Sequence, residues 1–185
     1  QAKGILNFLL KSTDLQVSYN FNMIAIHNRR PMMMALPLML DAYIDHQKEI
    51  VRRRSQYDLT RAEDRLHIVE GLMKALSILD EVIETIRAST DKRDAKNNII
   101  AKFGFSEEQA EAIVSLQLYR LTNTELTQLQ KEQDELHELV VKLKAILEDE
   151  KKLIRVIKSE LNDIKKRFTV PRLSTIEAEI EEIKV

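Results

Sequence analysis

The amino-acid sequence predicts a mainly α-helical protein: a long antiparallel coiled coil with a small helical globular tip and a small β element near the N-terminus. Three observations lead to this prediction. The 185 residues include only three glycines and three prolines, so few positions interrupt a helix. Apolar side chains recur at alternating spacings of three and four in two long segments. Turn and cap residues between positions 89 and 105 separate these segments.

The composition excludes several classes of protein. Lysine and arginine total 29 against 30 aspartates and glutamates, so no overall positive field favours nucleic acid or an anionic membrane. The absence of cysteine excludes disulfides, thiolate catalysis and cysteine-ligated zinc. No run of 18 apolar residues and no signal-peptide pattern occurs, which predicts a cytoplasmic protein with no membrane contact. Because Gln1 already lies in a helical pattern, we expect the chain to be a piece of a larger protein.

The first 37 residues, 1–37, are predicted to hold the β element. Residues 5–11 fit the end of a helix. The following LQVSYNFNM, residues 15–23, alternates apolar and polar side chains as a half-buried strand does. IAI extends this strand, HNRRP makes a turn, and MMMAL forms the return strand.

A helical pattern then runs from Leu38 to Ala88 with Gly71 as its single glycine. Residues 38–70 are assigned to the outgoing helix of the coiled coil. Its middle, residues 52–65, is too polar for a purely apolar seam and predicts a solvated segment that a partner supports. Gly71 is either a bend or a tolerated glycine within a helix. The last part of the pattern repeats at three and four through Val69, Leu72, Leu76, Leu79, Ile83 and Ile86.

The returning helix is predicted over residues 122–168, with Thr122 or Thr124 as its N-cap. Pro171 ends it, and residues 169–185 form an acidic amphipathic tail. The predicted seam is Leu126, Leu129, Gln133, Leu136, Val140, Leu143, Leu147, Glu150, Ile154, Ile157, Leu161, Ile164 and Phe168.

Only Gln133 and Glu150 interrupt this apolar seam. A single polar seam residue can fix the alignment of two helices, so we expect Glu150 to set the register by pairing with an arginine of the polar middle. The candidate arginines are Arg54, Arg61 and Arg65. Replacing Glu150 by leucine would then loosen the register while raising stability.

Residues 71–121 form the globular tip, here called the knob. Ser106 and Gln109 make a capping-box pattern that opens a helix to about Tyr119. This helix carries two apolar stripes: Ala110, Val114 and Leu118 with Leu121 beyond, and Ile113 and Leu116 with Ala112 alongside. A helix that is apolar on two sides is either fully buried or shared between its own core and a partner. Packing against a second copy and a purely intramolecular core both remain open.

Two further candidate sites have a simpler explanation. Asp64 with His67 and Asp134 with His137 repeat a carboxylate–histidine spacing that binds metal in di-iron bundles. Their heptad positions point outward or to the rim, so solvated helix faces are the better interpretation and no metal site is predicted. The basic run Arg52, Arg53 and Arg54 could contact a DNA backbone, with a solvated face as the alternative. No phosphate-binding loop and no common hydrolase motif is present.

Several long stretches resemble the A subunits of bacterial type IIA topoisomerases, the family that comprises the A subunits of topoisomerase IV and DNA gyrase. They are TDLQVSYNFNMIAI, HIVEGLMKALSILDEVIETIRAS, SEEQAEAIVSLQLYRLTNTE and LIRVIKSELNDIKKRF. The resemblance covers essentially the whole chain, and TDLQVSYNFNM and QLYRLTNTE are nearer to topoisomerase IV. It implies the C-terminal part of the breakage-reunion region: the end of the tower domain, the coiled coil and the C-terminal gate.

The resemblance also implies the partners and the chemistry. Two knobs would meet as a homodimer and form the exit gate for a transported DNA duplex during ATP-dependent strand passage, decatenation and supercoil relaxation. Mg²⁺ and ATP belong to the B subunit, so no cofactor is expected in this segment. The family's tyrosine nucleophile lies in a winged-helix domain upstream, and none of Tyr19, Tyr43, Tyr57 and Tyr119 matches it, so this segment alone is expected to be inactive.

The implied gate interface consists of residues on the knob helix and beyond it: Ala110, Ile113, Val114, Gln117, Leu118, Tyr119 and Leu121. The resemblance also implies the localisation of the enzyme, which is cytoplasmic and associated with the chromosome. The alternatives are the gyrase equivalent, a non-enzymatic coiled-coil dimerisation or chromosome-organising module, and a di-metal helical bundle.

Overall fold

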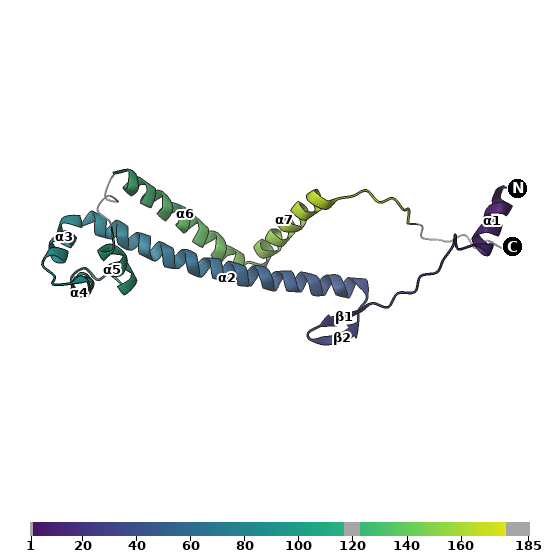
Figure 1. The fold of residues 1–185 in the computed structure, drawn as a ribbon, viewed down its shortest axis with the longest axis horizontal. Coiled ribbons are helices and arrows are strands. Elements are labelled where there is room, and N and C mark those ends of the chain that lie inside the picture. The colour runs from purple at the N-terminus through teal and green to yellow at the C-terminus, as the bar shows by residue number, and fades with distance from the viewer. Residues whose placement is uncertain (1, 117–122, 177–185) are drawn as a thin grey trace. The chain divides into compact units, whose positions relative to one another are not determined.

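The computed structural model describes residues 2–116 and 123–176, and these residues form seven helices and a two-stranded sheet (Figure 1). The elements are α1 (Ala2–Ser12), β1 (Ile24–His27), β2 (Arg30–Met33), α2 (Leu36–Ser77), α3 (Leu79–Arg87), α4 (Lys92–Phe103), α5 (Glu107–Val114), α6 (Asn123–Glu148) and α7 (Glu150–Phe168). The chain divides into two compact units, Gln1–His46 with Glu160–Val185, and Gln47–Ser159. The mainly helical fold class with a small β element is confirmed.

The first unit contains the β hairpin. β1 pairs antiparallel with β2, with Ile24 opposite Met33 and His27 opposite Arg30. The two residues of the turn, Asn28 and Arg29, have φ values of 50° and 63°. Positive φ at both central positions gives the twist that matches two flanking strands. The predicted turn is therefore confirmed, and the return strand begins at Arg30, earlier than the sequence indicated.

The predicted strand over residues 15–23 is wrong, because the ladder begins only at Ile24. The apolar members of the alternating pattern are exposed, among them Val17 at 71% and Tyr19 at 83%. A half-buried strand needs a neighbouring strand and a surface that covers its apolar face. Within the described residues, nothing supplies either one.

In the second unit α2 and α6 pack antiparallel (Figure 1). Leu59, Ala62 and Leu66 of α2 form a buried cluster with Val140 and Leu143 of α6. Two ion pairs join the same helices: Lys144 Nζ lies 2.7 Å from Glu63, and Arg65 donates two hydrogen bonds of 2.6 and 2.9 Å to Glu132. Residue numbers rise along one helix as they fall along the other, as the antiparallel prediction requires.

The polar middle of α2 nevertheless has a buried stripe. Ser55, Leu59 and Ala62 are 4%, 6% and 5% exposed, at spacings of four and three. Two of these side chains are small, so α6 can pack against a segment whose other residues are mostly charged. The segment is solvated on its other faces, as the sequence indicates.

The returning helix is not continuous, because it breaks at Asp149 into α6 and α7. The Asp149 carboxylate accepts a 2.8 Å hydrogen bond from the Lys151 backbone N–H, which is the action of an N-cap. The seam shifts across this break. Leu153 is 1% exposed, whereas the predicted seam residue Ile154 is 37% exposed. Val51 of α2 packs with Leu153 and with two neighbours, Ile146 and Ile157.

The knob has its own core. Leu72 and Ala75 at the end of α2 pack against Val82 of α3 and Ile99 of α4. Phe105, Ala110 and Ile113 complete this cluster. The outgoing helix continues past Gly71 into the knob and ends at Ser77, where a short turn at Ile78 leads into α3.

Candidate functional site

The knob helix α5 is the element on which the sequence places the candidate interface, and its start is held by a capping box. The Ser106 hydroxyl accepts a 3.2 Å hydrogen bond from the Gln109 backbone N–H, and the Gln109 side chain accepts one of 3.1 Å from Ser106 N–H. This confirms the predicted capping box. Just before it, Gly104 ends α4 with a left-handed φ of 69°, which favours glycine.

Gln109 also fastens α5 to α2. Its amide nitrogen donates a 2.8 Å hydrogen bond to the His67 carbonyl oxygen, and the His67 ring nitrogen Nε2 lies 2.7 Å from Ser106 Oγ. Beneath Gln109 is Gly71, where a Cβ atom would come within 2.5 Å of the Gln109 Cγ. Gly71 therefore permits close packing in a helix that continues to Ser77, and it is not a bend.

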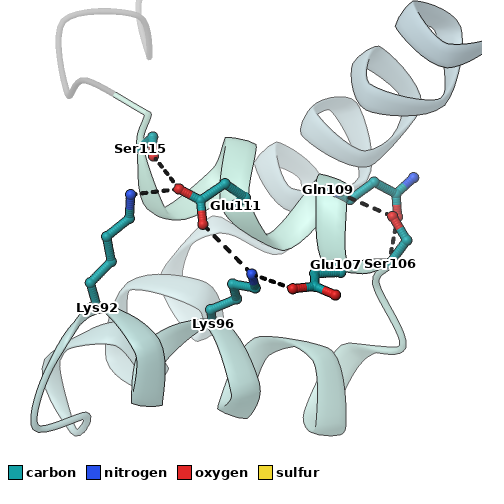
Figure 2. Close-up of polar contacts among 7 residues, drawn as sticks. All are labelled: Lys92, Lys96, Ser106, Glu107, Gln109, Glu111 and Ser115. Atoms are coloured by element: carbon teal, nitrogen blue, oxygen red, sulfur yellow. Dashed lines mark hydrogen bonds and ion pairs between the residues drawn. The ribbon is translucent and has the colours of Figure 1, made fainter.

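Ion pairs join α4 to α5 on one side of the knob (Figure 2). Lys92 Nζ lies 2.5 Å from Glu111, and Lys96 Nζ lies 2.7 Å from Glu107 and 3.8 Å from Glu111. The hydrogen bond from Lys92 lowers the pKa of the Glu111 carboxyl, and the hydrogen bond to Glu107 raises the pKa of Lys96. Both shifts favour the charged forms of the two groups.

The structure buries two of the proposed interface residues within this chain. Ala110 is 0% and Ile113 is 4% exposed, and both lie in the core of the knob. They offer no surface to a second copy in this conformation. Val114 is partly buried against the same core. The remaining proposed residues, Gln117, Leu118, Tyr119 and Leu121, lie outside the described residues, so the stripe through Leu118 stays a prediction.

The helix that was expected to reach Tyr119 ends at Val114. The Ser115 N–H still bonds to the Glu111 carbonyl, and the Leu116 N–H bonds to Ile113 over a tighter turn. Serine side chains form local hydrogen bonds that compete with a helix, and Ser115 Oγ lies 3.4 Å from the Glu111 carboxylate.

The three arginines proposed to face DNA do not form one patch. They lie on α2 between the buried Val51 and Ser55, and all three are exposed. Successive helix positions point about 100° apart, so Arg52, Arg53 and Arg54 project in different directions. Arg53 Nη1 lies 3.7 Å from Glu49.

The register residue Glu150 has a different partner from those expected. Its carboxylate accepts a 2.9 Å hydrogen bond from Lys48 Nζ, and this contact lowers the pKa of the Glu150 carboxyl. Arg65, one of the expected partners, bonds to Glu132 instead. The helix break at Asp149 turns Glu150 out of the seam, and its side chain is 58% exposed. The other seam residue, Gln133, is half-buried and its side chain lies 3.3 Å from Gln130.

The histidines of the two aspartate–histidine pairs contact different residues. His67 meets Ser106, whereas His137 lies 3.4 Å from Glu70. Among residues 2–116 and 123–176, no group of three or more histidines, aspartates and glutamates is arranged to hold a metal ion. In the same residues, no helix is both long and apolar enough to cross a membrane.

Sequence reasoning missed two features of the site. One is the cap at Asp149, whose signal was an aspartate directly followed by a glutamate at the first position of a helix. The other is the contact between Gly71 and Gln109, for which the lone glycine in a long helix was the signal.

Comparison with known proteins identifies the family. The family model of the DNA gyrase/topoisomerase IV A subunit matches residues 1–162. The A subunit of DNA topoisomerase 4 from Bacillus subtilis (strain 168) is 66% identical over 184 residues. The proteins of the same name from Staphylococcus epidermidis and Staphylococcus aureus are 58% and 57% identical. Each alignment covers 100% of this chain and 23% of the relative, so the chain spans about a quarter of their length. The chain belongs to the family of the DNA gyrase and topoisomerase IV A subunits.

Proposed function

We propose that the chain is the stalk and exit-gate segment of a type IIA topoisomerase A subunit of the topoisomerase IV kind. Two copies would meet through their knobs, and the joined knobs would close the path by which a transported DNA duplex leaves the enzyme. The relatives that are named A subunits of topoisomerase 4 support a topoisomerase IV A subunit over a gyrase A subunit. Membership of this family also favours it over a non-enzymatic coiled-coil module.

The observation that carries the proposal is the antiparallel pair α2 and α6, which leads into a knob with its own core. A gate must open and close repeatedly without unfolding, and a tip with a separate buried core can move as a unit. The fastening of α5 to α2 through Gln109 and His67 transmits a displacement of the stalk to the knob.

Chemistry would reside outside this segment. Strand cleavage would come from other parts of the full-length protein, whereas ATP and Mg²⁺ would act through the B subunit. Decatenation and relaxation therefore belong to the assembled enzyme, and we expect the segment alone to be inactive. An enzyme of this kind would act in the cytoplasm on the chromosome.

The test is to measure association in solution and locate it on the knob. Sedimentation equilibrium at micromolar concentrations gives the mass of the full-length protein. A single cysteine placed at Ser115, in a chain segment that has no natural cysteine, should link two copies through a short bismaleimide. A cysteine at Lys131, an exposed position on α6, is the matched control. Dimers that link through Lys131 and not through Ser115 would overturn the gate proposal.

A further inference from the structure

The break at Asp149 creates an elbow between α6 and α7 (Figure 1). A groove of about 650 Å³ lies along this elbow, lined by side chains from both helices. Its volume is within the range of ligand-binding clefts. Because α6 and α7 would otherwise form one straight helix, the groove exists only in the bent arrangement.

The floor of the groove is apolar. Val141, Ala145 and Ile146 come from α6, and Val156 comes from α7. Val141 is 67% exposed, although it lies beside the buried residues Val140 and Leu143. Its exposure leaves an apolar surface on the side of α6 that does not pack against α2.

The rim of the groove is cationic. Three cations lie around the apolar floor: Lys142, Lys152 and Arg155. The lining contains a single carboxylate, that of Glu138. Within the described part of the chain, no carboxylate lies within ion-pair distance of these three cations. This contrasts with Lys144 and Lys48, which pair with Glu63 and Glu150 on the neighbouring surface. The fifth polar residue of the lining, His137, already contacts Glu70.

We propose that the elbow groove binds an acidic amphipathic helix of a partner protein. A helix with apolar residues at spacings of three and four presents a stripe that fits an apolar groove. Carboxylates on its flanks would meet Lys142, Lys152 and Arg155, and such complementarity selects the partner and speeds its association. The Glu138 carboxylate and the apolar floor disfavour a nucleic acid, whose backbone offers only phosphates to the rim. The site lies off the knob and does not depend on dimerisation.

The test uses a fluorescently labelled peptide of 14 residues, with leucines at helical spacings of three and four and glutamates on the other face. We expect it to bind the full-length protein with a Kd on the order of 10 μM, measured by anisotropy. Val141→Asp, or Lys142→Glu together with Lys152→Glu, should weaken binding at least tenfold. Val141 and the two lysines are not in the core, so circular dichroism should show unchanged helicity. Lys158→Glu, an exposed site on α7 outside the groove, is the charge-matched control and should bind normally.

Three results would overturn the proposal. They are an absence of binding at about 1 mM peptide, equal binding of a peptide with lysines in place of the glutamates, and equal weakening by Lys158→Glu. The same measurement with a short DNA duplex tests the other partner class. If the duplex binds where the peptide does not, and the groove substitutions weaken that binding, the groove is a nucleic-acid site instead.

Discussion

Single side chains decide how the knob is joined to the long helix. Gly71 is buried at the point where α5 crosses α2, and Gln109 occupies the space that a Cβ would need. Gln109 cannot simply move aside, because its side chain bonds to Ser106 N–H and to the His67 carbonyl. The fit therefore depends on the absence of one methyl group.

We predict that Gly71→Ala destabilises the protein by about 1–3 kcal/mol, the usual cost of overpacking a tight contact. The substitution would otherwise gain about 1 kcal/mol of helix propensity. Urea unfolding followed by circular dichroism measures the difference. Gly4→Ala is the control, because nothing lies within 4 Å of a Cβ on that residue of α1, and it should leave stability equal or higher. A stabilising Gly71→Ala would show that Gln109 yields easily.

The pair of Glu150 and Lys48 makes a prediction about pH. The hydrogen bond from Lys48, followed by its charge, lowers the pKa of the Glu150 carboxyl. A carboxyl whose folded-state pKa is depressed contributes stability above its unfolded value of about 4.3, and this contribution is lost as pH falls through the folded value. Lys48→Met should return the Glu150 pKa, followed by carboxyl NMR titration, towards its ordinary value. Lys158→Met should leave it depressed, and an equal effect of the two substitutions would contradict the pairing.

The expectation for Glu150→Leu changes with this placement. A leucine there would lie on an exposed position at the start of α7 and would not fill the seam. The gain in stability that the sequence predicted has no basis in the structure.

At the scale of elements, caps decide where the helices begin. Ser106 starts α5 through a reciprocal capping box, and Asp91 starts α4 by accepting a 2.8 Å hydrogen bond from Asp94 N–H. Both lie on short helices of the knob, which have few residues over which to spread the cost of an uncapped end.

Ser106→Ala should cost about 1 kcal/mol of stability, the typical value for losing an N-cap hydroxyl. It also removes the contact to the His67 ring, so hydrogen exchange should increase first in α5. Ser77→Ala is the matched control, since the Ser77 hydroxyl only bonds to the Lys74 carbonyl one turn before it in α2. Equal losses in the two variants would mean that the capping box contributes little.

The sequence predicted several elements that residue type and spacing decide. The capping box at Ser106, the turn after Ala88, the hairpin turn and the antiparallel helix pair all follow from residue type and spacing. The strand over residues 15–23 failed because it depends on a partner surface, and the continuous helix through Asp149 failed because the local cap at Asp149 was missed. An alternating pattern needs something to cover it. In the seam of α7, Leu153 takes the predicted place of Ile154 beside Val51 of α2, whereas Ile157 lies in the seam as predicted. The candidate interface was predicted in part, since a stripe of apolar residues cannot show which side meets the chain's own core.

At the scale of the molecule, the described residues of both apolar stripes of the knob helix contact the chain's own core. The stripe with Ile113 is used inside this chain, and Ala110 joins it in the core. Val114 is only partly buried, and beyond it the first stripe continues in sequence to Leu118. If two copies meet through the knob, this continuation is the part of the stripe left to bury between them.

Leu118→Asp should therefore convert the dimer of the proposed gate into a monomer, because a carboxylate in an apolar interface must be desolvated without a partner. Sedimentation equilibrium of the full-length protein measures the mass, and circular dichroism establishes that the knob still folds. Val141→Asp, an exposed apolar position on α6 away from the knob, is the matched control and should leave the mass unchanged. A Leu118→Asp variant that keeps both its helicity and its dimeric mass would place the contact between copies elsewhere. In that case the two apolar stripes of the knob helix would both serve the chain's own core.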